Sequence, residues 1–160
     1  MNLYLLRHGK AEDRRPGLSE VDRHLTPEGV EEMRREAAGL AALQFRVDSI
    51  FSSPLPRALE TAQIVAKAIG FPETDIAVDS RIAGPFRIGD LQSLLAGQSP
   101  ASHVLLAGHE PTFSLMVHTL CGAVIDLKKG GMAYVETDRL EPGQGVLRWL
   151  LTPRLLMRAS

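Results

Sequence analysis

Arginine and histidine residues follow three apolar segments of the chain at the points where those segments end. Arg7 and His8 come directly after the apolar Leu3–Leu6. Arg57 closely follows a second such segment, and His109 follows a third. A guanidinium carries a fork of donors that matches phosphate oxygens, and a neutral imidazole is a nucleophile. The pattern therefore predicts a cationic phosphate pocket in which a histidine takes up the phosphoryl group.

Apolar segments of strand length alternate with helical patterns along the chain, which is typical of an α/β domain. We expect strands near residues 3–6, 49–52, 76–78, 104–107, 132–137 and 146–151. We expect helices over about 26–41, 55–69 and 111–120, and a short helix at 91–95. The prediction is a three-layer domain over 1–160, with a mainly parallel central sheet, helices on both faces and an antiparallel edge. Parallel strands would bring the polar residues together at one edge of the sheet.

Composition narrows the class of protein. The 160 residues carry a net charge of −1, which gives no reason to expect nucleic acid or an anionic membrane surface as the partner. No apolar run approaches the roughly 18 residues of a membrane-spanning helix, so we expect a cytoplasmic protein. The single cysteine, Cys121, excludes an internal disulfide and a multi-cysteine metal site. Neither a metal nor a cofactor is predicted.

Longer motifs around these residues resemble the histidine phosphatase superfamily, in its phosphoglycerate-mutase-like branch. They are Leu6–Gly9, Ser52–Ala62 and the pair Gly108-His109. Within that superfamily the chain looks most similar to the short phosphohistidine phosphatases of the SixA type. Their Leu-Thr-x-x-Gly helix start appears at Leu25–Gly29, and their Trp-x-x-x-Pro pattern appears at Trp149–Pro153.

The resemblance implies a role for each residue of the predicted pocket. His8 would be the phosphorylated nucleophile, Arg7 and Arg57 would bind phosphate oxygens, and His109 would stabilise the transferring group. Arg23 stands where short members also carry arginine, which makes it either a pocket residue or part of a loop salt bridge.

Gly9 follows the predicted nucleophile and has no side chain. We expect the absence of a Cβ to let the backbone come close to the phosphate, which makes Gly9 a predicted substrate-binding residue.

A general acid is harder to place. Members of the superfamily that cleave phosphate esters usually supply a Glu or Asp some tens of residues after the second arginine. Short phosphohistidine enzymes tend to have Glu-Leu there, and this chain has Arg81-Ile82. Asp79 and Glu110 are the remaining candidates. An alkoxide needs a proton to leave, whereas the nitrogen of a phosphohistidine leaves more readily.

We therefore expect a metal-independent phosphatase whose substrate is a histidine-phosphorylated protein. Two alternatives stay open: a phosphatase for small phosphomonoesters, and a phosphoprotein-binding module without turnover. A mutase is less favoured, because a bisphosphorylated intermediate calls for an enclosed site.

Overall fold

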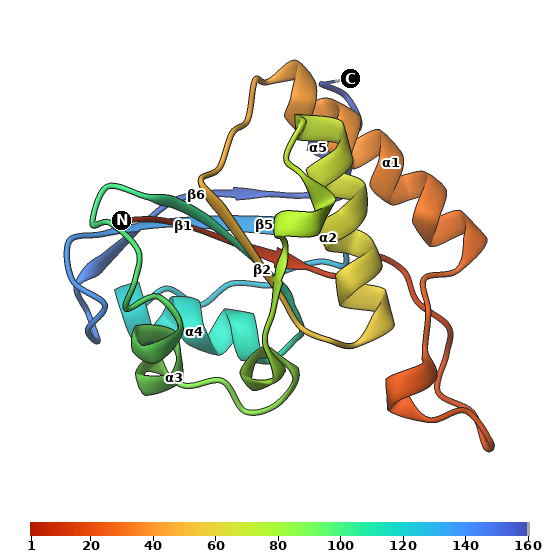
Figure 1. Cartoon of the computed structure of the whole chain (residues 1–160), viewed down its shortest axis with the longest axis horizontal. Helices are drawn as coiled ribbons and strands as arrows, with labels where there is room; N and C mark the ends of the chain where they lie inside the picture. The colour runs from red at the N-terminus through yellow and green to blue at the C-terminus, as the bar shows by residue number, and fades with distance from the viewer. Residues whose placement is uncertain (160) are drawn as a thin grey trace.

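The computed structural model describes residues 1–159, and the sheet lies between two layers of helices (Figure 1). The strands are β1 (Asn2–Arg7), β2 (Ser49–Ser52), β3 (Ala77–Val78), β4 (His103–Gly108), β5 (Met132–Thr137) and β6 (Gly145–Leu151). The α-helices are α1 (Pro27–Ala42), α2 (Pro56–Ile69), α3 (Ile88–Leu94), α4 (Thr112–Cys121) and α5 (Pro153–Leu156). Short 3-10 turns occur at Glu20–Asp22, Glu73–Asp75 and Ser80–Ala83.

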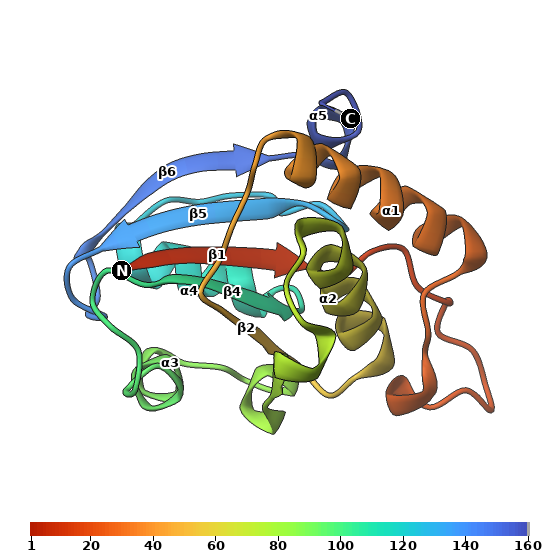
Figure 2. The same cartoon turned by 45° about the horizontal axis from the view of Figure 1, so that its top comes forward.

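The six strands form one sheet in the order β3-β2-β4-β1-β5-β6. The first four are parallel, and β5 runs antiparallel to both β1 and β6. At the centre of the sheet Leu5 of β1 lies between Leu106 of β4 and Ala133 of β5. Figure 2 shows β1, β2 and β4 ending at the same side of the molecule. The predicted parallel sheet with an antiparallel edge is confirmed.

Alternate residues of β1 supply the two hydrophobic cores. Leu3 and Leu5 pack with buried residues of α3 and α4 on one face of the sheet. Tyr4 and Leu6 pack with α1, α2 and α5 on the other face. Successive side chains of a strand point to opposite faces, so a strand covered on both sides is apolar at every position. This is why Leu3–Leu6 is an uninterrupted apolar run.

Helix starts follow local signals in the chain. Thr26 caps α1, because its hydroxyl accepts the Gly29 amide at 2.9 Å, and Pro27 occupies the first helical position. The start of α3 differs from the sequence prediction by three residues. The Asp90 carboxylate accepts the Arg87 amide at 2.8 Å, which lets the helix begin at Ile88.

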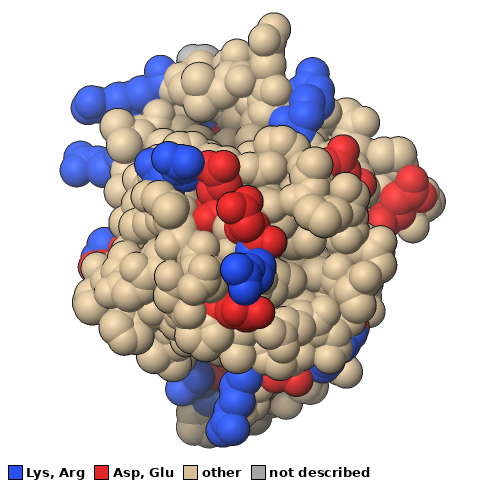
Figure 3. Space-filling model, turned by 90° about the vertical axis from the view of Figure 1, so that its left-hand side faces the viewer, with Lys and Arg blue, Asp and Glu red and all other residues tan. Residues whose placement is uncertain are grey.

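The end of the molecule opposite the carboxyl ends of the parallel strands carries charges of both signs (Figure 3). Acidic and basic side chains lie next to one another there, among uncharged residues. Within residues 1–159, no helix combines the length and the apolar character needed to cross a membrane.

Candidate active site

The carboxyl ends of β1, β2 and β4 open onto one surface cavity of about 450 Å³. Its lining comprises Arg7, His8, Asp13, Arg14, Arg23, Arg57, His109, Glu110 and Lys129. Arg7 and His8 come from the end of β1, Arg57 from the first turn of α2, and His109 from the end of β4. The four residues predicted to hold a phosphoryl group therefore line one cavity.

His8 is held with one ring nitrogen free. Its Nδ1 lies 2.8 Å from the carbonyl oxygen of Gly9. A carbonyl only accepts, so we assign the proton to Nδ1 and the lone pair to Nε2. Burial is the main cause that lowers the pKa of His8 to about 4, and the charges of Arg57 and Arg7 add to it. The imidazole is therefore neutral near pH 7, with Nε2 available as a nucleophile.

His109 lies beside His8, with ring centroids 5.3 Å apart. Its Nε2 is 2.7 Å from the hydroxyl of Ser53, which itself accepts the Leu55 amide. The serine proton is thus free to point to Nε2, which places the imidazole proton on Nδ1. Burial, then the neighbouring His8, lowers the pKa of His109 to about 3. Nδ1 is buried without a hydrogen-bond partner, so His109 presents an unused donor.

The two arginines of the predicted pocket are each tied down through their outer nitrogens. Arg7 donates from Nη1 to the Leu127 carbonyl at 2.9 Å. Arg57, which is 6% exposed, donates from Nη1 to the Glu20 carbonyl at 2.8 Å and from Nη2 to the Glu20 carboxylate at 3.1 Å. In both residues Nε is buried and has no partner. Buried donors are rarely left unpaired in native proteins, so these atoms mark a place for an acceptor.

The segment from Leu127 to Gly131 forms a side of the site that sequence analysis missed. Gly130, at φ +79°, donates its amide to the carbonyls of both Arg7 and His8 at 3.1 Å. Lys129 lines the cavity, and its charge contributes to the lowered pKa of His8. Two lysines and two glycines before a predicted strand were the available signal, but nothing in the sequence related them to His8.

Gly9 has a packing reason for lacking a side chain. A Cβ on this residue would lie 2.5 Å from Cγ of Met33 in α1, which is too close. The Gly9 amide donates to the Thr61 hydroxyl of α2 at 3.1 Å. Gly9 is not among the residues that line the cavity. The structure thus places Gly9 between α1 and α2, outside the cavity lining.

Arg23 lines the cavity and belongs to a loop salt bridge as well. Its Nη1 donates to both carboxylate oxygens of Glu20, at 2.9 and 3.0 Å, and its Nε donates to the Glu12 carbonyl at 2.6 Å. Arg14 also donates to Glu20, at 2.6 Å. Glu20 therefore joins three arginines of the cavity, although the sequence offered no reason to single it out.

The two candidates for a general acid differ in position. Glu110 lines the cavity, and its carboxylate accepts from the Ser114 amide at 3.0 Å and from the Ser114 hydroxyl at 2.5 Å. Asp79 lies outside the cavity lining and accepts the Arg81 amide and guanidinium. Hydrogen bonds from Arg81 lower the pKa of Asp79, so this carboxyl is ionised at neutral pH.

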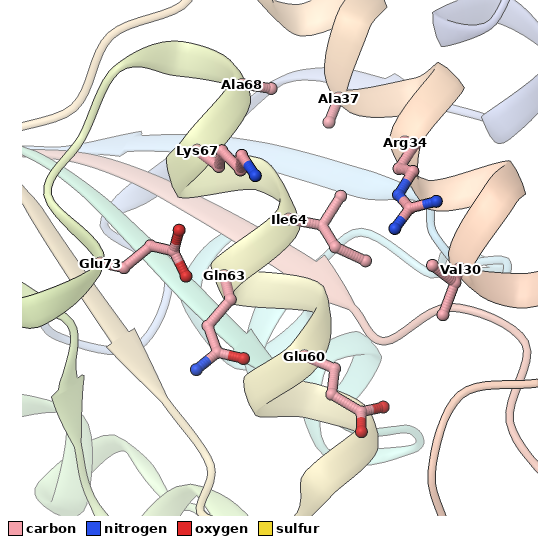
Figure 4. A pocket seen from close by; sticks show the side chains of 9 residues that line it. All are labelled: Val30, Arg34, Ala37, Glu60, Gln63, Ile64, Lys67, Ala68 and Glu73. Carbon is pink, nitrogen blue, oxygen red and sulfur yellow. The ribbon is translucent and has the colours of Figure 1, made fainter.

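A larger hollow of about 530 Å³ lies between α1 and α2 (Figure 4). Val30 and Ile64 provide apolar surface, and Arg34, Lys67 and Glu60 provide charges of both signs. It contains neither a histidine nor a cysteine. Over residues 1–159, no three His, Cys, Asp or Glu side chains are grouped in a way that could hold a metal ion. The chemistry suited to phosphate is thus in the smaller cavity.

Comparison with known proteins decides the family. Residues 3–84, just over half of the chain, match the histidine phosphatase superfamily (branch 1). The chain belongs to this superfamily. An uncharacterized protein of Picosynechococcus sp. is 31% identical in an alignment of 141 residues that covers 82% of this chain and 82% of that protein.

Solved structures agree with this placement of the chain in the superfamily. The protein histidine phosphatase SixA, in complex with tungstate, superimposes with a TM-score of 0.83 and 25% identity, over 98% of this chain and 99% of that one. A putative phosphohistidine phosphatase SixA from Agrobacterium tumefaciens superimposes with a TM-score of 0.74 and 28% identity, over 95% of this chain and 97% of that one. A phosphoserine phosphatase from Entamoeba histolytica, at 18% identity, a TM-score of 0.69 and coverage of 96% and 98%, shares the fold. The predicted resemblance to the SixA-type phosphohistidine phosphatases is confirmed, and the protein is a phosphatase.

Proposed function

We propose that this phosphatase removes phosphate from histidine-phosphorylated proteins by way of a phosphohistidine on its own His8. The observation that carries the proposal is the set of unpaired groups on residues that line the cavity. The Nε atoms of Arg7 and Arg57 and Nδ1 of His109 are donors without partners, and Nε2 of His8 holds a free lone pair. A phosphoryl group offers three oxygens to such donors and a phosphorus atom to such a nucleophile.

The reaction proceeds in two displacements. Nε2 of His8 attacks the phosphorus in line, and the bond from phosphorus to the substrate imidazole breaks with its electron pair passing to that imidazole, which takes a proton from solvent. Arg7, Arg57 and His109 hold the charge on the phosphoryl oxygens. Water then attacks the phosphorus, the bond to Nε2 breaks, and inorganic phosphate leaves with the lone pair restored to His8. The two guanidinium groups supply the positive charge that a metal supplies in other phosphoryl-transfer sites.

The state of the carboxylates favours a phosphohistidine substrate over a phosphate ester. Asp79 is ionised and engaged with Arg81, and both oxygens of Glu110 accept from Ser114. An alkoxide leaving group would need a proton from one of them, whereas a leaving imidazole is itself a good proton acceptor. The SixA proteins that resemble this chain are described as protein histidine or phosphohistidine phosphatases, which supports the same substrate class.

Phosphate release tests the proposal directly. A histidine-phosphorylated carrier protein and a panel of small phosphate esters are incubated with the enzyme in EDTA, for the unmodified protein, His8→Ala and the control His118→Ala. His118 is an exposed histidine on α4 that does not line the cavity.

We expect fast release from the carrier, slow release from the esters, no release with His8→Ala, and full activity with His118→Ala. Acid-labile phosphate should become trapped on the unmodified enzyme. Fast ester turnover would refute the substrate class and direct attention to Glu110. Binding of phosphate without any turnover would refute the proposed reaction at His8 in favour of a phosphoprotein-binding module.

A further inference from the structure

Glu20 is a carboxylate that contacts three arginines of the cavity lining, and the mechanism above does not use it. Its two oxygens accept from Arg14 at 2.6 Å, from Arg23 at 2.9 and 3.0 Å, and from Arg57 at 3.1 Å. Its backbone carbonyl accepts from Arg57 as well, at 2.8 Å. One residue of the 3-10 turn Glu20–Asp22 thus contacts three of the arginines that line the cavity.

These contacts have a direct effect on the phosphate-binding arginine. Nη1 and Nη2 of Arg57 each donate one hydrogen bond to Glu20, and the buried Nε has no partner. Burial and the charges of Arg23 and Arg14 act against the protonated form of Arg57, and Glu20 acts in its favour. A counter-ion is needed here, because three like charges on one cavity would otherwise repel one another.

Glu20 is unsuited to the role of general acid. Burial opposes its ionisation, but hydrogen bonds from Arg23 and Arg14 outweigh that effect and lower the pKa of Glu20. The carboxylate therefore carries no proton at neutral pH that it could give to a leaving group. Its value to the site lies in its charge and its geometry.

We propose that Glu20 is a positioning residue that holds the Arg57 guanidinium for phosphate and gathers Arg14 and Arg23 around it. The inference rests on the proposed function, since it assigns Arg57 to the phosphate. With Glu20 in this role, the loop from Lys10 to His24 belongs to the catalytic site. Removing the carboxylate charge weakens the hydrogen bond from Arg57 Nη2, so the guanidinium is held less firmly for the phosphate.

A double-mutant cycle tests the proposal with two readouts, phosphate release from the histidine-phosphorylated carrier and calorimetric binding of inorganic phosphate. The variants are Glu20→Gln, Arg57→Gln and the pair. Glu28→Gln is the matched control, because Glu28 forms an exposed ion pair with Lys10 outside the cavity. The loss of a charge-assisted hydrogen bond leads us to expect about tenfold weaker phosphate binding and slower turnover in Glu20→Gln.

In the Arg57→Gln background the same substitution should cost nothing further, because Glu20 acts through Arg57. Equal behaviour of Glu20→Gln and Glu28→Gln would overturn the proposal, and so would additive losses in the double variant. Tighter phosphate binding in Glu20→Gln would also overturn it, by showing that the carboxylate competes with phosphate. The phosphate-binding cycle tests the role of Glu20 even if the unmodified enzyme turns over no substrate. Failure of the proposed function can therefore be distinguished from failure of the proposal about Glu20.

Discussion

Replacement of Glu36 by glutamine should change how the stability of this protein depends on pH. Glu36 lies on α1, is 2% exposed, and has a buried Oε2 without a hydrogen-bond partner. Its carboxylate sits against Gly130, where an added Cβ would lie 2.3 Å from Oε2. Burial is the main cause that raises the pKa of Glu36 from 4.5 to about 8, and the charge of Glu32 adds to it.

The direction in which stability changes with pH follows from proton linkage. The folded protein holds the Glu36 proton more tightly than the unfolded chain does, so the stability that this carboxyl contributes is fully present below pH 4.5. It then falls as the pH rises, until the folded protein also loses the proton near pH 8. Each tenfold difference in proton affinity is worth about 1.4 kcal/mol, so the free energy of unfolding should fall by up to about 4 kcal/mol between pH 5 and 8.5. Glu36→Gln cannot ionise, and its curve should lack this fall.

Urea unfolding followed by circular dichroism, at intervals from pH 5 to 8.5, measures the effect. Glu31→Gln is the control, because Glu31 is an exposed residue of the same helix. Other titrating groups are common to all three proteins, so they cancel in the comparison. If the curves of Glu36→Gln and the unmodified protein run parallel within about 1 kcal/mol, Glu36 is not a buried neutral carboxyl and the reasoning is refuted.

Three further predictions concern the active site and the loop beside it. Gly130→Ala should lose about 2 kcal/mol or more of stability, because φ is +79° and the new Cβ would meet Glu36. The rate of phosphate release should also fall in Gly130→Ala, because the Gly130 amide donates to the carbonyl of His8. Urea unfolding measures the first effect and a phosphate-release assay the second, and a variant with unchanged stability and activity would contradict the prediction. The acid limb of kcat/KM should lie near pH 4 rather than 6.5, because burial lowers the pKa of His8; a limb at pH 6 to 7 in the pH–rate profile would contradict this. His24→Gln should melt at a lower temperature than the unmodified protein at pH 5.5 and at the same temperature at pH 9. The hydrogen bond to Glu60 raises the pKa of His24. The ion pair between His24 and Glu60 therefore stabilises the protein at low pH, and this contribution is lost as the pH rises through the raised pKa. Equal melting temperatures of the variant and the unmodified protein at both pH values would refute the prediction.

Part of the site could be predicted because strand ends are visible in the sequence. The uninterrupted run Leu3–Leu6 is apolar since both faces of β1 are covered, and the chain turns polar at Arg7 where that cover ends. His109 follows β4 in the same way. Once the strands are parallel neighbours, these residues must meet at one edge of the sheet. The fold class and the shared cavity of the four predicted residues follow from that pattern.

Tertiary structure alone decided which groups surround the residues that we predict to bind phosphate. Arg7 donates to Leu127, 120 positions away, and Arg57 to Glu20, 37 positions away. Such contacts depend on where loops fold back over the sheet, and loops have no hydrophobic period from which a neighbour can be inferred. The sequence by itself therefore determined the strands, the helix caps and the residues at the strand ends. The partners that orient those residues came only from the packing of segments distant in the chain.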